Sequence, residues 1–269
     1  MTNTKDKIIN LENTKKAKEV FDLGGLLPQI FSHLSKDLKP KLIACFESLD
    51  DALFDLSEKA DSNQNQTLYF ETMRNIRKKR PQVFADFFES LKLTFKNFKN
   101  NKFDYFEADF GFNSETKSLS LSLVDEKELD ETLAKTNLIN KSDMAYHRQL
   151  FAFGKRFSVL ASGTELKTSH IPLSPHVLVN SFSRCLNNLD IDINIKLIIY
   201  KLFERNIMGQ LTNIYTFVNE FLASQGIVPE ITYNVNQQNR NTAQPTLVSQ
   251  TNTANHQISQ NQQPNSNSD

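Results

Sequence analysis

Histidine is the side chain that most often serves as a metal ligand or a proton carrier, and the histidines of this 269-residue chain are widely scattered. Two metal-binding histidines on one helix face would stand four residues apart, and no two histidines here have that spacing. His170 and His176 come closest, on either side of a loop that contains Pro172, where capping or solvated histidines are the alternative to a metal site. The sequence therefore predicts no metal-ligating residues.

Carboxylate pairs such as Asp50-Asp51 and Asp130-Glu131 are the next candidates for chemistry. General acid–base catalysis needs two carboxyl groups whose surroundings separate their pKa values, and spacing alone does not establish such surroundings. Solvated helix faces, and acidic first turns favoured by the helix dipole, account for the same pairs. We therefore expect no catalytic residues among them.

Glycine-rich phosphate-binding loops are absent from the sequence. Gly24-Gly25 is not followed by the Lys-Ser/Thr of a P-loop, and neither G-x-G-x-x-G nor the hydrolase motif G-x-S-x-G occurs. These absences predict that the chain binds no nucleotide cofactor and is not an enzyme.

A run of basic residues is the sharpest local charge feature of the chain. It consists of Arg74, Arg77, Lys78, Lys79 and Arg80. One interpretation is a patch for an acidic protein partner, for phosphate or for nucleic acid, and the other is a solvated helix end whose cations the helix dipole favours. Because the formal net charge of the chain is zero, nucleic acid is disfavoured as the main ligand.

Aromatic residues are used in an unusual way, with 21 phenylalanines and no tryptophan. Most of these phenylalanines have the spacing of a helical core. One stretch differs because acidic residues interrupt its pattern, and we interpret it as a docking segment, either between two parts of the chain or onto another chain. Its aromatic members are Phe103, Tyr105, Phe106, Phe110 and Phe112.

Two cysteines, Cys45 and Cys185, each stand among apolar neighbours at helical spacing, so we expect two buried free thiols rather than a disulfide. Residues 1–12 are polar and lack the apolar segment of a secretory signal. The longest apolar run is Leu197–Tyr200, far short of a membrane span. These features predict a cytoplasmic protein.

Helical spacing dominates the first half of the chain. A short helix is expected around 20–37, interrupted at Gly24-Gly25, and a second begins at Leu38. A third helix is expected from about Thr67, and Pro81 should kink it or start a new one because proline lacks an N–H.

The second half should begin with a short extended segment of alternating leucines at 119–123. Asp125 with Glu128 forms a capping-box pattern, which predicts one long helix to about Leu160. We expect that helix to bury Leu129, Leu133, Leu150 and Phe157.

Three shorter helices should follow. Ser174-Pro175 is an N-cap followed by a first-turn proline, and Asp190–Asp192 leads into the next helix. The last helix should end at Gly226 and Pro229, where glycine supplies the left-handed cap and proline the break.

Together these elements predict an all-α protein, a multi-helix bundle in two helical halves with disordered ends. The ranges are 1–16 for the disordered N-terminus, 17–98 for the first half, 99–118 for a linker, 119–232 for the second half, and 233–269 for a disordered tail. Nearly half of the tail is Asn and Gln, which cannot bury enough apolar surface to order it.

Several stretches, in order, resemble a bacterial family known as domain of unknown function 1631. They are Asp50–Ala60, Tyr69–Arg74 with the basic run to Pro81, Leu119–Leu129, Ile193–Phe203, and Gly209–Pro229. The resemblance covers roughly Leu26–Pro229 and implies an all-helical, cytoplasmic protein without established catalytic residues.

Members of that family are often labelled thymidine phosphorylase, an activity that requires a phosphate-binding glycine-rich loop and an α/β domain. This chain has neither, so the label is disfavoured. Long members carry a C-terminal region that resembles a PilZ domain, which binds cyclic di-GMP. The R-x-x-x-R and D/N-x-S-x-x-G elements of such a domain are missing after Pro229, so the resemblance implies the helical portion alone.

The sequence therefore predicts a non-enzymatic helical scaffold or regulator that acts through protein–protein contacts, including contacts with a second copy of the chain. The family resemblance further implies a link to cyclic di-GMP signalling. The sequence predicts no bound cofactor. The alternatives are a regulator that responds to nucleotides or nucleic acid through the basic run, and an enzyme.

Overall fold

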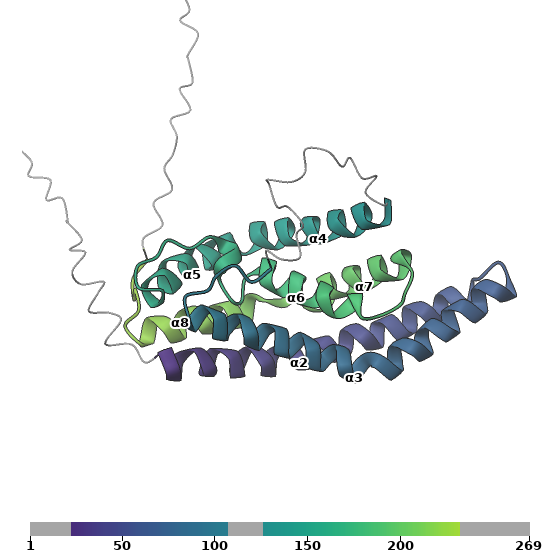
Figure 1. Cartoon of the computed structure of the whole chain (residues 1–269), viewed down its shortest axis with the longest axis horizontal. Helices are drawn as coiled ribbons and strands as arrows, with labels where there is room; N and C mark the ends of the chain where they lie inside the picture. The colour runs from purple at the N-terminus through teal and green to yellow at the C-terminus, as the bar shows by residue number, and fades with distance from the viewer. Residues whose placement is uncertain (1–22, 107–125, 232–269) are drawn as a thin grey trace, which may run out of the picture. The chain divides into compact units, whose positions relative to one another are not determined.

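The computed structural model of the chain describes residues 23–106 and 126–231, and in these ranges every regular element is helical. Seven α-helices, α2 to α8, and two short 3₁₀ helices follow one another along the chain (Figure 1). The all-α prediction is confirmed. The expected ends, the extended segment at 119–123 and the cap at Asp125 lie outside the described residues.

Helices α2 (Leu23–Glu58) and α3 (Asn63–Lys99) form a long antiparallel hairpin (Figure 1). In the turn between them, the Ser62 hydroxyl accepts a hydrogen bond from the Asn65 N–H at 3.2 Å, which caps the start of α3. Leucines such as Leu34, Leu38 and Leu42 stand four residues apart on α2 and are fully buried, which holds the hairpin together.

The prediction that these two helices are interrupted is wrong. Helix α2 runs unbroken through Gly24-Gly25, Pro28 and Pro40, and α3 runs unbroken through Pro81. A proline inside a helix removes one backbone hydrogen bond. Burial of one continuous apolar stripe on each helix outweighs that loss.

The single helix expected up to Leu160 is instead two, α4 (Glu126–Ala145) and α5 (His147–Leu160), which separate at Tyr146. The buried Tyr146 hydroxyl donates a hydrogen bond to the Met208 carbonyl at 2.9 Å and accepts one from the Leu211 N–H at 3.2 Å. This anchor ties the break between the helices to a distant turn, a contact that local sequence does not reveal.

The prediction that α4 buries Leu129 and Leu133 is also wrong, since these side chains are 58% and 55% exposed. The inward residue at this level of the helix is Glu131, which accepts hydrogen bonds from the Tyr200 hydroxyl (2.7 Å) and the Lys196 ammonium (3.1 Å). Glu131 lies two residues from each leucine, on the opposite face of the helix, and its partners fix the rotation of α4. Leu150 and Phe157 on α5 are buried as expected.

Helix α6 (Pro175–Asn187) lies at the centre and contacts both α3 and α4. The predicted cap is confirmed, because the Ser174 hydroxyl accepts a hydrogen bond from the Val177 N–H at 3.3 Å. Phe182 is fully buried, stacks on Phe203 with ring centres 4.0 Å apart, and meets Phe87 edge-to-face at 6.0 Å. The phenylalanine-rich core expected from the composition is therefore present.

Helices α7 (Ile193–Asn206) and α8 (Thr212–Ser224) complete the bundle and pack against α2. Asp192 caps α7 by accepting a hydrogen bond from the Asn194 N–H at 2.9 Å. Gly226 ends α8 with a φ of +78°, and the N–H of Ile227 reaches back to the Leu222 carbonyl at 3.0 Å, which completes the glycine cap.

One hydrophobic core joins the helices before and after residues 107–125. Helix α2 contacts α7 and α8, and α3 contacts α6, so the two predicted halves share their interior. Cys45 and Cys185 are both free and buried in this core, as expected. No described helix has a stretch long and apolar enough to span a membrane.

We expect Tyr146→Phe to lower the free energy of unfolding by about 2 kcal/mol, because it leaves a buried carbonyl and a buried N–H without a partner. Urea denaturation followed by circular dichroism measures this change. Tyr69→Phe is the matched control, since Tyr69 is only partly buried and contributes no hydroxyl hydrogen bond among the described residues. Equal stability of the two variants would show that the Tyr146 anchor is unimportant.

Candidate functional site

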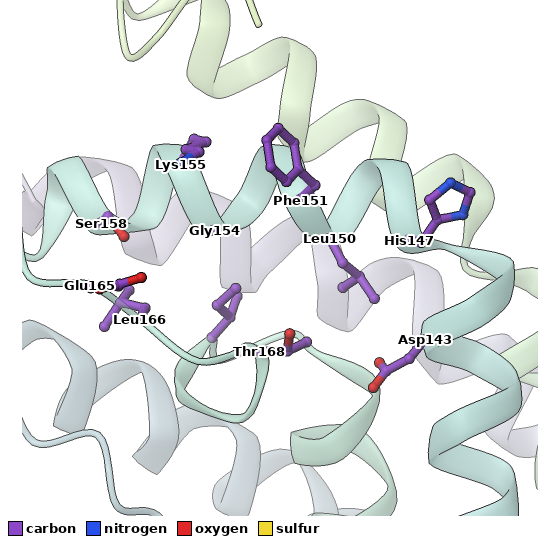
Figure 2. A pocket seen from close by; sticks show the side chains of 11 residues that line it. Asp143, His147, Leu150, Phe151, Gly154, Lys155, Ser158, Glu165, Leu166 and Thr168 are labelled. Carbon is purple, nitrogen blue, oxygen red and sulfur yellow. The ribbon is translucent and has the colours of Figure 1, made fainter. Parts of the chain in front are cut away.

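A pocket of about 390 Å³ lies between α5 and the loop that leads through η1 (Thr168–His170) to α6 (Figure 2). This volume lies near the lower end of the range that is usual for ligand pockets in proteins. Leu150 and Ile171 are buried and supply apolar lining, while Leu166 is partly buried. The polar lining comes from the end of α4, from α5 and from the loop, and comprises Asp143, His147, Lys155, Ser158, Glu165 and Thr168.

Asp143 is the most unusual of these polar residues. Its Oδ1 atom is buried and has no hydrogen-bond partner among the described residues. Burial raises the pKa of the Asp143 carboxyl above its ordinary value. Because this oxygen is buried, it is not exposed at the surface of the pocket.

Gly154 lies in the middle of α5 and lines the pocket. No heavy atom lies within 4 Å of the position that a Cβ atom would take there, so the absence of a side chain leaves open space. A glycine in a helix interior costs stability relative to alanine, by about 1 kcal/mol. Glycine therefore widens this pocket without being required by the backbone.

The basic run lies in the middle of α3, because the helix continues through Pro81. Arg77 and Arg80 both donate to Asp50 on α2, at 3.1 Å and 2.7 Å, and Lys79 donates to the Asn188 carbonyl at the end of α6 at 3.2 Å. Three of the five basic residues thus bind other parts of the chain. The other two, Arg74 and Lys78, are exposed and form no ion pair within residues 23–106 and 126–231.

The first part of the predicted docking segment lies against η1 and α6. Phe103 stacks on the His170 ring with centres 5.9 Å apart, and the Tyr105 hydroxyl donates to the His170 carbonyl at 2.8 Å. Phe106 is buried, with the Arg184 guanidinium 4.5 Å above its ring. These residues therefore connect the hairpin to the later helices. Phe110 and Phe112 lie outside the described residues.

His170 and His176 contact a backbone N–H and an aromatic ring, respectively, and His170 Nε2 also lies 3.9 Å from Asp104 Oδ1. The Nδ1 atom of His170 accepts the Lys167 N–H at 3.4 Å, a local capping contact, and Phe106 meets the His176 ring at 6.2 Å. Burial, with a smaller contribution from His170, lowers the pKa of His176 below its ordinary value. No group of three or more metal-ligating side chains occurs among the described residues.

Sequence reasoning missed the pocket and its residues. Asp143 and Glu165 are separated by a helix break and a loop, and nothing in their spacing indicates that they share a cavity. The one usable signal is Gly154, a glycine inside an otherwise helical pattern, which often marks a packing or functional requirement.

Asp143→Asn should stabilise the protein at neutral pH. The raised pKa means that the folded state disfavours the charged carboxylate, so this penalty grows as pH rises through the pKa and is absent where both states are protonated. The other titratable groups near Asp143 are His147, Lys155 and Glu165, which line the same pocket, and the buried Tyr146 and Tyr215. The gain in melting temperature over wild type should therefore be largest near neutral pH and vanish in acid.

Thermal melts across the acid range measure this gain. Asp51→Asn, at an exposed position on α2, is the control and should leave the pH profile of wild type unchanged. A destabilised Asp143→Asn variant at neutral pH would contradict the prediction, because it would mean that the carboxylate is already well compensated.

The basic run offers a second prediction. Arg80→Met should lower the free energy of unfolding by about 1–2 kcal/mol, since it leaves the partly buried Asp50 with a weaker partner. Arg74→Met should change it by less than about 0.5 kcal/mol, as is usual for exposed residues. Chemical denaturation measures both changes. An equal loss of unfolding free energy in the two variants would show that Arg80 is no more important to the fold than the exposed Arg74.

Comparison with known proteins gives one match. Residues 22–226 match the family model described as Protein of unknown function (DUF1631) N-terminal domain. No curated protein and no solved structure matches the chain. The match covers most of the chain and confirms the resemblance seen in the sequence, including its restriction to the helical portion. The chain therefore belongs to the DUF1631 family and contains the family's N-terminal domain.

Proposed function

We propose that this chain is a cytoplasmic, non-enzymatic helical scaffold or regulator that acts by binding other proteins. The observation that carries the proposal is a set of exposed side chains at the end of the α2–α3 hairpin. We call this surface the hairpin tip, and it consists of Phe54, Phe70 and Arg74.

The hairpin tip exposes large apolar groups to solvent. Phe54 and Phe70 are 46% and 43% exposed, and their rings lie 6.4 Å apart on neighbouring helices. Clustered exposed aromatic residues mark protein interaction sites more often than isolated ones do. Arg74 stands one helical turn after Phe70, so a cation borders the aromatic pair.

The position of the hairpin tip supports this role. On α3, Lys79 donates a hydrogen bond to the Asn188 carbonyl at the end of α6, and nearer the turn Phe70 contacts Phe54 of the same hairpin. Figure 1 shows the turn between α2 and α3 extending past the ends of α4 and α7. Each helix of a pair covers only one side of its partner. Apolar side chains on the other sides therefore remain exposed to solvent at this end of the hairpin.

The alternative of a nucleotide or nucleic-acid ligand is less well supported. Phosphate binding at Arg77 or Arg80 would compete with Asp50, which already holds both guanidinium groups. Only Arg74 and Lys78 would remain as cations, fewer than the phosphate contacts usual for nucleic-acid binding. A role in cyclic di-GMP signalling, suggested by the family resemblance, would then run through a protein partner.

We expect the double variant Phe54→Ser/Phe70→Ser to lose partner binding and remain folded. Both side chains are nearly half exposed and neither belongs to the buried core, so the change in stability should stay within about 1 kcal/mol. Quantitative affinity capture from cells that produce the chain, followed by mass spectrometry, compares the proteins retained by each variant.

Leu93→Ser is the matched control, since Leu93 is 47% exposed on α3 but lies away from the hairpin tip. Self-association is measured in parallel by light scattering of the purified chain, which identifies a second copy as the partner. Identical sets of captured proteins and identical masses for wild type and the double variant would contradict the proposal.

A further inference from the structure

We propose that a groove between α2 and α3 binds an amphipathic helix with acidic flanks from a partner protein. The groove is a second surface of the hairpin, and its role is independent of the hairpin tip. Three features support the proposal, namely the shape of the groove, its aromatic lining and the lysines on both of its rims.

The groove is a hollow of about 390 Å³ to which both helices of the hairpin contribute. Among the described residues, all those that line it belong to α2 or α3, which Figure 1 shows running side by side. Seen from the turn, the groove lies beyond the ion pair between Asp50 and Arg80. A hollow between two antiparallel helices has the shape into which the apolar face of a third helix packs.

Phe31 on α2 and Phe84 and Phe88 on α3 form the apolar lining, and each ring is partly buried. Phe31 meets Phe95 edge-to-face with ring centres 5.5 Å apart, and Phe84 meets Phe46 in the same way at 5.2 Å. Contacts across the hairpin therefore hold two of these rings in place. Because this surface is already formed, it can receive the apolar side chains of a helix with little loss of conformational freedom.

Lysines stand on both rims of the groove. Lys39 on α2 and Lys92 on α3 line it directly. Helical spacing extends each row along the same side of its helix, three residues before Lys39 and four and seven residues after Lys92. The lysines of the two rims, all of them exposed, are Lys36, Lys39, Lys92, Lys96 and Lys99.

Glu89 is the one acidic residue among the described residues that line the groove, and its carboxylate lies 3.8 Å from the Lys92 ammonium. The other four rim lysines form no ion pair within residues 23–106 and 126–231. The helix dipole favours the two lysines at the end of α3, but it does not account for the two in the interior of α2. A helix with carboxylates on both sides of its apolar stripe would meet cations on each rim.

The same features weigh against other occupants. A second copy that docked through its own groove would bring its lysines against these lysines, and like charges repel. A membrane-binding face inserts its aromatic side chains into the lipid, whereas these three phenylalanines lie partly buried in a hollow. Nucleic acid would use the lysines but would leave the apolar lining uncovered.

The experiment is a fluorescence-anisotropy titration of the full chain with a labelled synthetic helix of about 18 residues, or five turns. Its leucines recur every third or fourth residue, and glutamates flank them on both sides. A second peptide has lysine in place of each glutamate, and a third has the composition of the first in scrambled order. The acidic helix should bind, and more weakly as salt concentration rises, because ions screen the lysines.

The lysine helix should not bind wild-type protein. The scrambled peptide should bind at least about tenfold more weakly than the acidic helix, because its leucines do not share one face.

Two variants locate the binding. Lys39→Glu/Lys92→Glu should weaken binding of the acidic helix at least about tenfold, because it reverses one charge on each rim. The same variant should bind the lysine helix more tightly than wild type does. Ala85→Trp should abolish binding of the acidic helix, since Ala85 is exposed and lines the groove, and the added ring would occupy the hollow.

Matched controls keep the charge and bulk of these variants but place them elsewhere. Arg148→Glu/Lys201→Glu makes the same change in net charge at exposed positions off the hairpin, and Ala145→Trp adds the same ring at an exposed alanine of α4. Both should bind the acidic helix like wild type. Phe54→Ser/Phe70→Ser should do so as well, so failure of the groove and failure of the hairpin tip are distinguishable. Thermal melts test whether each variant is folded.

Several results would overturn the proposal. The first is wild-type protein that does not bind the acidic helix, and the second is a scrambled peptide that binds equally well, which would show that charge alone attracts it. The third is a folded Ala85→Trp or Lys39→Glu/Lys92→Glu variant that binds like wild type. The fourth is binding of phosphatidylserine vesicles, of a DNA oligonucleotide or of a second copy that Ala85→Trp abolishes, which would assign the groove to that occupant instead.

Discussion

Helix α6 is buried on nearly all sides, and its neighbours must meet the demands that this burial creates. Its buried polar residues, Asn180, Ser181 and Ser183, cannot reach bulk water, so each needs a partner inside the protein. The Ser181 hydroxyl receives one from Ser90 on α3 at 3.1 Å, and Ser183 donates to Glu131 on α4 at 3.3 Å. Asn180 donates to the His176 carbonyl one turn earlier at 2.8 Å. Apolar packing and these bonds together place α3 and α4 around α6.

Glu131 extends the same network to α7. Burial alone would raise the pKa of the Glu131 carboxyl. The hydrogen bonds from Tyr200 and Lys196 outweigh this effect and bring the pKa below its ordinary value, so the carboxylate is kept charged. A charged carboxylate with three donors from α6 and α7 holds α4 in one rotation. That rotation faces Leu129 and Leu133 outward and buries Leu138, so the polar contact and apolar burial together decide which side of α4 meets the core.

Polar groups thus have two different roles in this molecule. Glu131 and Asp50 are carboxylates with cationic partners, and each joins two helices. Asp143 is a carboxylate with a buried oxygen and no such partner among the described residues, and it lines a pocket. The charges of Glu131 and Asp50 are each compensated by a cation on another helix, whereas the Asp143 charge has no such compensation among the described residues.

The sequence by itself determined the helical class, the caps at Ser174 and Gly226, the buried cysteines and the family. These depend on local spacing and on single residues whose backbone preferences are strong, so neighbours in the chain suffice to predict them. Tertiary structure alone decided the continuity of α2 and α3 through their prolines, the break at Tyr146, and which of the basic residues remain free. It also decided that Asp143 and Glu165 share one pocket. Each of these outcomes depends on residues far apart in the chain, and burial or hydrogen bonding between them outweighs what the local pattern favours.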